Sequence, residues 1–312
     1  MPEFALKTQL KHVFFDQRNT GVAENEIAAV FNGPRTGPFS FIANTGTGGA
    51  AEYITSEALA AGCLTTRQPQ QIFEEMLAQV ASFEPESLDE MARAEADLAI
   101  DFSNDLAYAI GNEFAFTIES FSTSGPAWTL AVMVNDSAVL EDSIGRIVEA
   151  VNTAQANAGE AKNIAFSSED MNGRTWSTLQ PDWQPFGVTW TYDRGYMVAS
   201  SDRATALRAI ATRDGGYPLI WSSEFQQAFP TSAGMHPSGF AWINASDAVQ
   251  DISPFIENPA LRELIAERDP ILVVLDGETE QIRAVSRTRL SSILLDALLF
   301  QGAGISDTVQ QN

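Results

Sequence analysis

The sequence contains one run with the spacing of a phosphate-binding loop, Gly46-Thr47-Gly48-Gly49-Ala50-Ala51. In a dinucleotide-binding fold, such glycines let the backbone approach a pyrophosphate at the start of a helix. Here residues 50–61 would form that helix, and Arg67 would lie near a 2′-phosphate. Two features weigh against this chemistry: Tyr53-Ile54-Thr55 favours a strand, and the strands further along the chain come in hairpins. We therefore interpret the run as a flexible turn rather than a nucleotide site.

Zinc chemistry based on histidine, or a Ser-His-Asp triad, would have to use His12 or His236, because the chain has two histidines. Neither has a carboxylate at helical ligand spacing, and no G-x-S-x-G motif is present. The single cysteine, Cys63, excludes an internal disulfide and lies in an apolar segment typical of a buried thiol. The sequence therefore predicts no catalytic residue, no cofactor and no metal site.

Paired carboxylates are another possible catalytic device, since glycoside hydrolysis uses two of them at a defined separation. The chain offers many close pairs, as expected from its 41 acidic residues: Glu24/Glu26, Glu74/Glu75, Asp89/Glu90, Glu141/Asp142, Glu169/Asp170 and Glu278/Glu280. Sequence alone places none of them in a cleft, and no calcium-loop spacing occurs. A carboxylate-based hydrolase acting on glycans is therefore kept as an alternative, and an enzyme is the less favoured class.

Aromatic residues form the most suggestive cluster, between residues 176 and 221. A sheet face packed in the core is the favoured explanation, and a platform for a partner or an apolar ligand is the alternative. Trp183 and Phe186 stand out because prolines at 181 and 185 lower the entropy cost of ordering their loop, Gln180–Gly187. Charge is sparse there, so we expect both side chains to be exposed and to contact a partner or ligand.

The charge balance restricts the partners of this chain. Its 312 residues carry a formal net charge of −23, with 41 acidic and 18 basic residues. Nucleic acid is excluded as a partner, and an anionic bilayer is disfavoured, because both require clustered Lys and Arg. No run reaches the roughly 18 apolar residues of a transmembrane segment. The amino end, Met1-Pro2-Glu3-Phe4, lacks the basic and apolar regions of a signal peptide.

The elements that carry these residues recur as one unit: an apolar strand, a short polar corner and an amphipathic helix. The unit occurs at Gly62–Val80, Trp128–Val151, Tyr196–Arg213 and Phe240–Ile256. Hairpin signals at Asp193-Arg194-Gly195 and Asp276-Gly277 require antiparallel neighbours. The predicted fold class is α+β, with a large, mainly antiparallel twisted sheet, or two related sheets, built from these recurrent units, and with helices on one face.

Other segments carry weaker signals. We expect a strand over Phe39–Ala43, a hairpin over Glu52–Thr66, helices over Ser87–Ala99 and Leu106–Ile110, a helix capped at Ser223 and a final helix over about Ser291–Gln301. Residues 4–31 are ambiguous between helix and strand. The weakest seam lies near residues 97–111. It divides the chain into an N-terminal strand, hairpin and helical part (1–100) and a main α+β part (101–312), unless residues 1–312 form one continuous domain.

Several segments of the sequence resemble those of a known family: Asp105–Phe116, Pro126–Val132 with Asn135-Asp136, Asn172–Leu179 and Thr189–Ser200. Over about residues 50–300 the chain resembles an uncharacterised bacterial family of exported proteins, a domain-of-unknown-function family. Members are commonly longer and begin with a signal peptide, whereas this chain shows neither feature. The resemblance implies a periplasmic or extracellular location, with the cytoplasm as the alternative. It transfers no catalytic residue, and it favours the hairpin at residues 52–66 over a nucleotide loop.

These observations rank three functions. The first is a non-enzymatic exported binding or scaffold protein that works with a protein partner, as a homo-oligomer or as a subunit of a larger assembly. The alternatives are the carboxylate-based hydrolase on glycans and a carrier whose sheet and helices enclose an apolar ligand.

Overall fold

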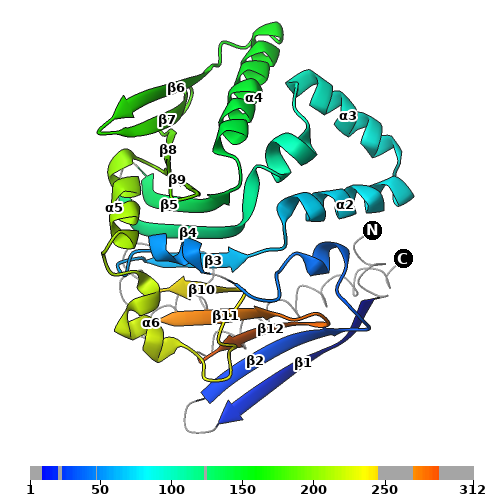
Figure 1. The fold of residues 1–312 in the computed structure, drawn as a ribbon, viewed down its shortest axis with the longest axis vertical. Helices are drawn as coiled ribbons and strands as arrows, with labels where there is room; N and C mark the ends of the chain where they lie inside the picture. The colour runs from blue at the N-terminus through cyan, green and yellow to red at the C-terminus, as the bar shows by residue number, and fades with distance from the viewer. Residues whose placement is uncertain (1–8, 20–22, 47, 123–124, 245–269, 288–312) are drawn as a thin grey trace, which may run out of the picture.

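The fold is built on one twelve-stranded sheet in which every pair of neighbouring strands is antiparallel (Figure 1). The structure is a computed structural model that describes residues 9–19, 23–46, 48–122, 125–244 and 270–287. The sheet order is β1-β2-β12-β11-β10-β3-β4-β5-β9-β8-β7-β6. The strands are β1 (Leu10–Asn19), β2 (Ala23–Phe31), β3 (Ala60–Thr65), β4 (Ile110–Ser122), β5 (Gly125–Val134), β6 (Ile164–Met171), β7 (Arg174–Pro181), β8 (Val188–Asp193), β9 (Tyr196–Ser200), β10 (Gly239–Ile243), β11 (Ile271–Gly277) and β12 (Gln281–Ser286). The predicted α+β class with a large antiparallel sheet is confirmed.

Tight turns explain why neighbouring strands run in opposite directions. Arg194 and Gly195, between β8 and β9, both have positive φ, at 47° and 83°. Asn172 and Gly173, between β6 and β7, repeat this geometry at 52° and 77°. Two successive positive φ angles are characteristic of the turn that matches the twist of a β-hairpin. The predicted hairpins at Asp193-Arg194-Gly195 and between β11 and β12 are thus confirmed.

Three helices follow strands as the recurrent units predicted, and two of them begin at a polar cap. The α-helices are α2 (Pro69–Phe83), α3 (Glu86–Leu98), α4 (Ser137–Asn157), α5 (Arg203–Arg213) and α6 (Ser223–Ala228). The carboxylate of Asp136 accepts hydrogen bonds from the first turn of α4, and that of Asp202 does the same for α5. Thus β3 leads to α2, β5 to α4 and β9 to α5. The fourth predicted helix, within residues 248–256, lies outside the described residues, as do those predicted within 259–268 and near 291–301.

Short helical segments fill the connections. They are η1 (Gly37–Ser40), η2 (Gly49–Tyr53) and η4 (Leu219–Trp221), which are 3₁₀ turns, and η3 (Phe102–Ala107), a π-helical segment. The helix predicted over Leu106–Ile110 is therefore displaced, because β4 already begins at Ile110. The cap of α6 is Ser222 rather than Ser223, since the Ser222 hydroxyl accepts from the Phe225 N–H.

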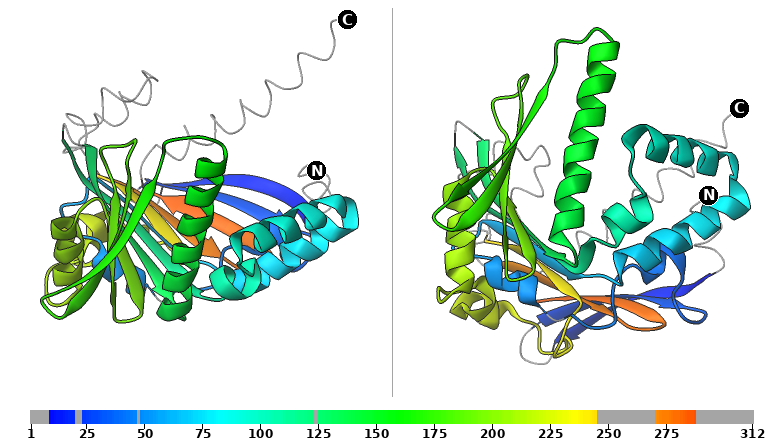
Figure 2. Two further views of the ribbon diagram at one scale, coloured as in Figure 1. Left: turned by 90° about the horizontal axis from the view of Figure 1, so that it is seen from above. Right: turned by 45° about the horizontal axis from the view of Figure 1, so that its top comes forward.

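Helices α4 and α5 lie on opposite sides of strands β6–β9 (Figures 1 and 2). Glu141 of α4 hydrogen-bonds with Ser177 and Trp190, whereas Arg203 of α5 lies over the ring of Trp176. Adjacent residues of a strand point to opposite faces, so Trp176 and Ser177 face different helices. Trp176 and Trp190 are both buried, and each face therefore needs its own cover. The expectation of helices on one face is not confirmed.

The main buried cluster lies on the side of the sheet covered by η2, α5, η4 and α6. Its largest fully buried side chains include Tyr53, Ile54, Val198, Leu219, Trp242, Leu272 and Val274. Residues as far apart in the sequence as Ala50 and Val274 belong to this cluster. Strands from both sides of residue 100 pair directly, β3 with β4 and β2 with β12. The proposed domain boundary near residue 100 stays a prediction.

Two predicted strand segments are wrong. Residues 39–43 form the end of η1 and a single bridge between Ile42 and Thr66, because the carbonyls of Phe39 and Ile42 turn towards Arg35. The expected hairpin over residues 52–66 does not form: its second strand is present within β3, but η2 takes the place of the start of its first strand. Tyr53 lies in η2 and is buried in the core, while β3 pairs with β10 and β4 instead. The ambiguous residues 10–31 form the antiparallel pair β1–β2 over their described part.

Candidate functional site

A cavity of about 410 Å³ opens between η2, the start of β10 and α6. Its lining comprises Gly46, Gly48, Ala51, Cys63, Thr65, Ile220, Trp221, Phe225, Gln226, Phe229, Met235, His236, Pro237, Ser238, Gly239 and Phe240. None of these residues is Asp, Glu, Lys or Arg, although the chain has 41 acidic residues. We call this cavity the uncharged pocket. Its size is typical of small-molecule sites.

The floor and one wall of the uncharged pocket come from paired strands and an aromatic cluster. Cys63 of β3 and Phe240 of β10 are directly opposite in the sheet, so both side chains face the same side. The ring of Phe225 in α6 lies 5.0 Å from that of Phe240, nearly edge-on, and 6.0 Å from that of Phe229. These contacts hold the apolar wall in a defined shape.

The rim of the uncharged pocket carries apolar side chains that face solvent. Met235 is 92% exposed and Trp221 is 54% exposed. The hydroxyl of the exposed Tyr217 donates to the Trp221 carbonyl at 2.5 Å, and this bond holds residues 217–221 in a turn at the rim. Large exposed apolar groups around a concave site favour binding of an apolar ligand or partner group.

The glycine run at residues 46–49 borders this pocket for packing reasons. A Cβ on Gly46 would lie 2.5 Å from the Pro237 carbonyl oxygen, and one on Gly49 would collide with the Tyr196 hydroxyl. Gly48 has φ +78°, a conformation that L side chains rarely adopt. The segment after the run is the five-residue η2 rather than a long helix. The glycines therefore permit close packing of the loop. A dinucleotide site would need a long helix after them, and η2 does not provide one.

Cys63 lies at the base of the uncharged pocket as a protonated thiol. Burial and the nearby Glu113 carboxylate raise the pKa of Cys63 to about 12. Glu113 is itself buried and accepts hydrogen bonds from the Ala50 N–H at 3.0 Å and the Tyr196 hydroxyl at 2.7 Å. Since the thiolate is the nucleophilic form of cysteine, this environment does not activate Cys63 for attack on a substrate.

A buried polar network fixes η2, which carries Ala51 of the pocket wall. The guanidinium of Arg213 lies 4.8 Å from the centre of the Tyr53 ring and 4.9 Å from that of Tyr196. It also hydrogen-bonds the Tyr53 hydroxyl, which in turn donates to Asp193 at 3.0 Å. Arg174 completes the network with an ion pair to Asp193 at 2.8 Å. Burial raises the pKa of Tyr53 and of Tyr196, so both remain neutral hydrogen-bond donors.

The two histidines take separate places. His236 lines the uncharged pocket, whereas His12 lies on β1 with its ring 6.2 Å from that of Phe14. Within the described residues, no group of three His, Cys, Asp or Glu side chains is placed to hold a metal ion. His236 therefore supplies a polar group to the pocket, without partners for a zinc site there.

Trp183 and Phe186 lie in the loop between β7 and β8, where they are 40% and 58% exposed. The loop is anchored at its base, since the Asp182 N–H donates to the Asn163 carbonyl and Gln180 donates to the Gln184 carbonyl. Neither aromatic residue lines the uncharged pocket. Their contact with a partner stays a prediction.

Two further cavities contain carboxylates, but neither combines a carboxylate pair with an aromatic residue. One further cavity holds Asp97 and Glu149 but no aromatic residue, and another holds Glu149 beside Phe166. The Glu141 carboxylate accepts hydrogen bonds from Ser177, Trp190 and Tyr192. The Glu24 carboxylate accepts hydrogen bonds from Thr231 and Ser232. These two glutamates join elements of the fold.

Sequence reasoning missed the residues of the uncharged pocket as a group, although one signal was present. Residues 225–246 contain no Asp, Glu, Lys or Arg, in a chain that is 19% charged. That run supplies much of the lining, including Phe225, Met235 and His236. Gly46, Cys63 and Trp221 come from other segments, so their convergence required the tertiary structure.

Comparisons with known proteins return no relative: no family model, no curated protein and no solved structure matches the chain. The resemblance to a family of exported proteins therefore stays a prediction. Among the described residues, no helix combines the length and apolar character needed to cross a bilayer.

Proposed function

We propose that this chain is a non-enzymatic binding protein whose uncharged pocket takes a small, neutral, largely apolar ligand. The observation that carries the proposal is the lining itself: sixteen residues without a formal charge on a protein of net charge −23. Charged groups are excluded where an apolar ligand binds, because an unpaired charge against apolar atoms is costly.

The binding free energy would come mainly from burial of apolar surface. Each 100 Å² of apolar ligand surface removed from water contributes about 2.5 kcal/mol. The Phe225 and Phe240 rings offer such surface in a preformed wall. His236, Gln226 and Ser238 add polar atoms for orientation, so a ligand with one hydrogen-bonding group fits this lining best.

A scaffold role is the second candidate, and the exposure of Trp183 and Phe186 favours it. Under this second candidate, the protein is exported to the periplasm or the extracellular space, as the family resemblance implies. There it binds a protein partner or a second copy of itself. The cytoplasm is the alternative location. The uncharged pocket and the two cavities that contain Glu149 do not support the alternative of a carboxylate-based hydrolase, since none of the three joins two carboxylates with an aromatic residue.

The ligand proposal is tested with Nile red, an uncharged apolar dye whose fluorescence rises on transfer from water. We expect saturable binding to the intact protein, and weakening of about fivefold or more in Trp221→Ala and in Met235→Asp. Both residues are largely exposed, so the fold should tolerate these changes. Met235→Leu keeps the apolar volume and is the matched control.

Trp183→Ala separates the two candidates. It should leave Nile red binding unchanged if the dye enters the uncharged pocket, and should weaken capture of a protein partner if the scaffold role holds. Nile red affinity that is unaffected by both Trp221→Ala and Met235→Asp would reject the ligand proposal. Partner affinity unchanged by Trp183→Ala, with circular dichroism showing an intact fold, would reject the predicted contact.

A further inference from the structure

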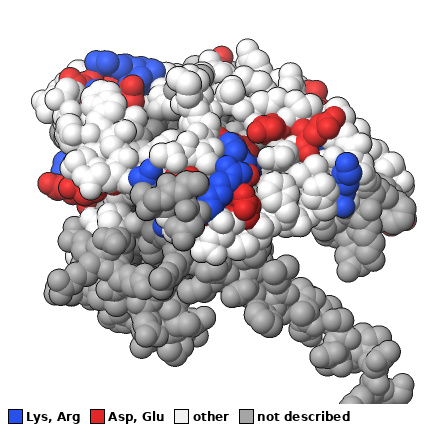
Figure 3. All heavy atoms as spheres, turned by 90° about the horizontal axis from the view of Figure 1, so that it is seen from below, with Lys and Arg blue, Asp and Glu red and all other residues white. Residues whose placement is uncertain are grey.

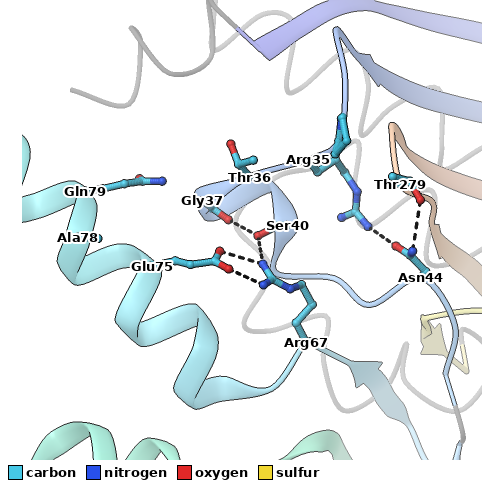
Figure 4. Close-up of a pocket in the computed structure, with 11 residues that line it drawn as sticks. Arg35, Thr36, Gly37, Ser40, Asn44, Arg67, Glu75, Ala78, Gln79 and Thr279 are labelled. Atoms are coloured by element: carbon cyan, nitrogen blue, oxygen red, sulfur yellow. Dashed lines mark hydrogen bonds and ion pairs between the residues drawn. The ribbon is translucent and has the colours of Figure 1, made fainter.

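A second cavity, of about 470 Å³, lies between η1, α2 and the turn that joins β11 to β12. In contrast to the uncharged pocket, it is lined by two arginines, Arg35 and Arg67, together with one carboxylate, Glu75. Neutral polar side chains, among them Thr36, Gln79 and Thr279, complete its polar lining. Figure 4 shows Arg35 and Arg67 entering this arginine cavity from separate segments, with Gln79 and Glu75 on the helix beside them.

Arg35 is exceptional among the arginines of this protein. In the part of the chain that the structure describes, every arginine except Arg35 and Arg93 forms an ion pair with a carboxylate. Figure 3 shows the same pattern on one face, where blue basic side chains lie against red acidic ones at several points. Arg93 is exposed to water, whereas Arg35 is only 8% exposed. A buried charge without a counter-charge is rare, because burial removes its hydration.

The described partners of Arg35 are all neutral oxygens. Its Nε donates to the Glu278 carbonyl at 2.6 Å, and one Nη donates to the Phe39 carbonyl at 2.7 Å. The other Nη donates to the Ile42 carbonyl at 2.9 Å and to Asn44 at 3.1 Å. These bonds use four of the five N–H groups of a guanidinium. They anchor the loop before β3 to the β11–β12 turn, but they do not neutralise the charge.

The second arginine of the cavity is already paired. Arg67 forms two hydrogen bonds with the Glu75 carboxylate, at 2.9 and 2.5 Å, and donates to the Ser40 hydroxyl at 2.6 Å (Figure 4). Arg35, Arg67 and Glu75 together leave one positive charge at the cavity. Burial and the repulsion from Arg67 lower the pKa of Arg35.

We propose that the arginine cavity binds the carboxylate of a small organic monoanion, with Arg35 supplying its counter-charge. A single negative charge neutralises the excess of one positive charge, whereas a dianion would exceed it in a protein that is already strongly acidic. Four N–H groups of Arg35 are used by the bonds given above, and the remaining one can donate to an oxygen of the bound carboxylate. Thr36, Gln79 and Thr279 provide neutral groups for the rest of the molecule. This site is separate from the uncharged pocket and does not depend on the function proposed for it.

The test uses two probes of nearly the same size and shape, the monoanion N-acetylglycine and its neutral amide N-acetylglycinamide, titrated calorimetrically at constant ionic strength. We expect N-acetylglycine to bind at least about tenfold more tightly than the amide. Glu75→Gln should tighten binding of N-acetylglycine by about threefold or more, because it removes a negative charge from the cavity. Glu74→Gln, one position earlier on α2 and outside the lining, is the matched control and should leave the affinity for N-acetylglycine unchanged.

Arg35→Gln should weaken binding of N-acetylglycine by about tenfold or more. Arg35 also anchors a loop, so Arg35→Gln could fail to fold. In that case the affinity of Glu75→Gln for N-acetylglycine decides the test. Equal affinity for the acid and the amide would overturn the proposal, as would unchanged affinity in Glu75→Gln or no saturation with N-acetylglycine up to about 50 mM. Tighter binding of inorganic phosphate than of N-acetylglycine would also overturn it, in favour of a phosphate site.

Discussion

At the residue scale, the clearest electrostatic feature outside the two cavities is Glu24 on β2. Its carboxylate is buried and accepts hydrogen bonds from the backbone and hydroxyl of Thr231 and of Ser232, at 2.6 to 3.2 Å. Arg287 lies 3.3 Å away. Burial by itself raises the pKa of Glu24, but the hydrogen bonds from Ser232 and Thr231 outweigh it and lower the pKa to about 2. Glu24 therefore couples β2 to the loop that follows α6.

This residue makes a pH-dependent contribution to stability. Its folded-state pKa lies below the value near 4.5 of the unfolded chain, so the stabilisation is complete above that pH and is lost as the pH falls towards 2. We expect Glu24→Gln to lower the free energy of unfolding at pH 7 by about 2 kcal/mol, because it weakens the charge-assisted hydrogen bonds from Thr231 and Ser232. Urea unfolding measured from pH 7 to pH 2.5 should show this difference shrinking in acid.

Glu90→Gln provides the control for that series. Glu90 is exposed on α3, and its replacement should alter stability by less than about 0.5 kcal/mol at any pH. A wild-type advantage over Glu24→Gln that stays constant down to pH 2.5 would contradict the role assigned to the Glu24 carboxylate.

At the element scale, α4 depends on one side chain for its polar attachment to strands β7 and β8. Glu141 accepts from the Trp190 Nε1–H at 2.9 Å, from the Tyr192 hydroxyl at 2.8 Å and from the Ser177 hydroxyl. Trp190 also stacks on Phe166 of β6, with ring centres 5.9 Å apart. The helix and these strands thus share one mixed polar and aromatic interface.

Glu141→Ala should weaken that interface. It leaves the buried indole N–H of Trp190 and the Tyr192 hydroxyl without their acceptor, which costs about 2 kcal/mol or more in unfolding free energy. Tyr192→Phe removes one donor and leaves Glu141 bonded to the other two, so we expect a smaller loss. Chemical denaturation followed by tryptophan fluorescence measures both. A loss in Tyr192→Phe equal to that in Glu141→Ala would show that Glu141 is not the shared anchor.

At the scale of the whole molecule, excess negative charge opposes the compact state. The net charge is −23, and exposed ion pairs such as Arg194–Asp214 contribute little to stability. Screening of the carboxylate repulsion should therefore outweigh the loss of these pairs. We expect the melting temperature to rise by several degrees between about 10 mM and about 500 mM NaCl.

Tetramethylammonium chloride separates screening from specific cation binding. It should raise the melting temperature as much as NaCl does, because both salts have the same Debye length at equal concentration. A melting temperature that falls with salt would mean that the ion pairs dominate over the repulsion.

Local elements were predictable from the sequence wherever one periodicity or one turn signal dominated. Helix α4 and the hairpin between β8 and β9 are examples, since their apolar spacing and Asp193-Arg194-Gly195 turn are encoded within a few residues. Residues 39–43 were mispredicted because a distant contact overrides local preference there: Arg35 takes the carbonyls that a strand would need. The strand predicted at Tyr53 was likewise wrong, because Tyr53 lies in a 3₁₀ turn and packs into the core from there.

By itself, the sequence determined the α+β class, the antiparallel hairpins, the net charge of −23 and an uncharged run at residues 225–246, because all of these depend on composition or on neighbours along the chain. Only the tertiary structure decided which segments meet. The strand order places β10 between β3 and β11, which brings Cys63 and Phe240 to one pocket. It also brings Arg35 to the carbonyl of Glu278, 243 residues away. Such contacts depend on how the sheet is ordered, and no local pattern of residue types records that order.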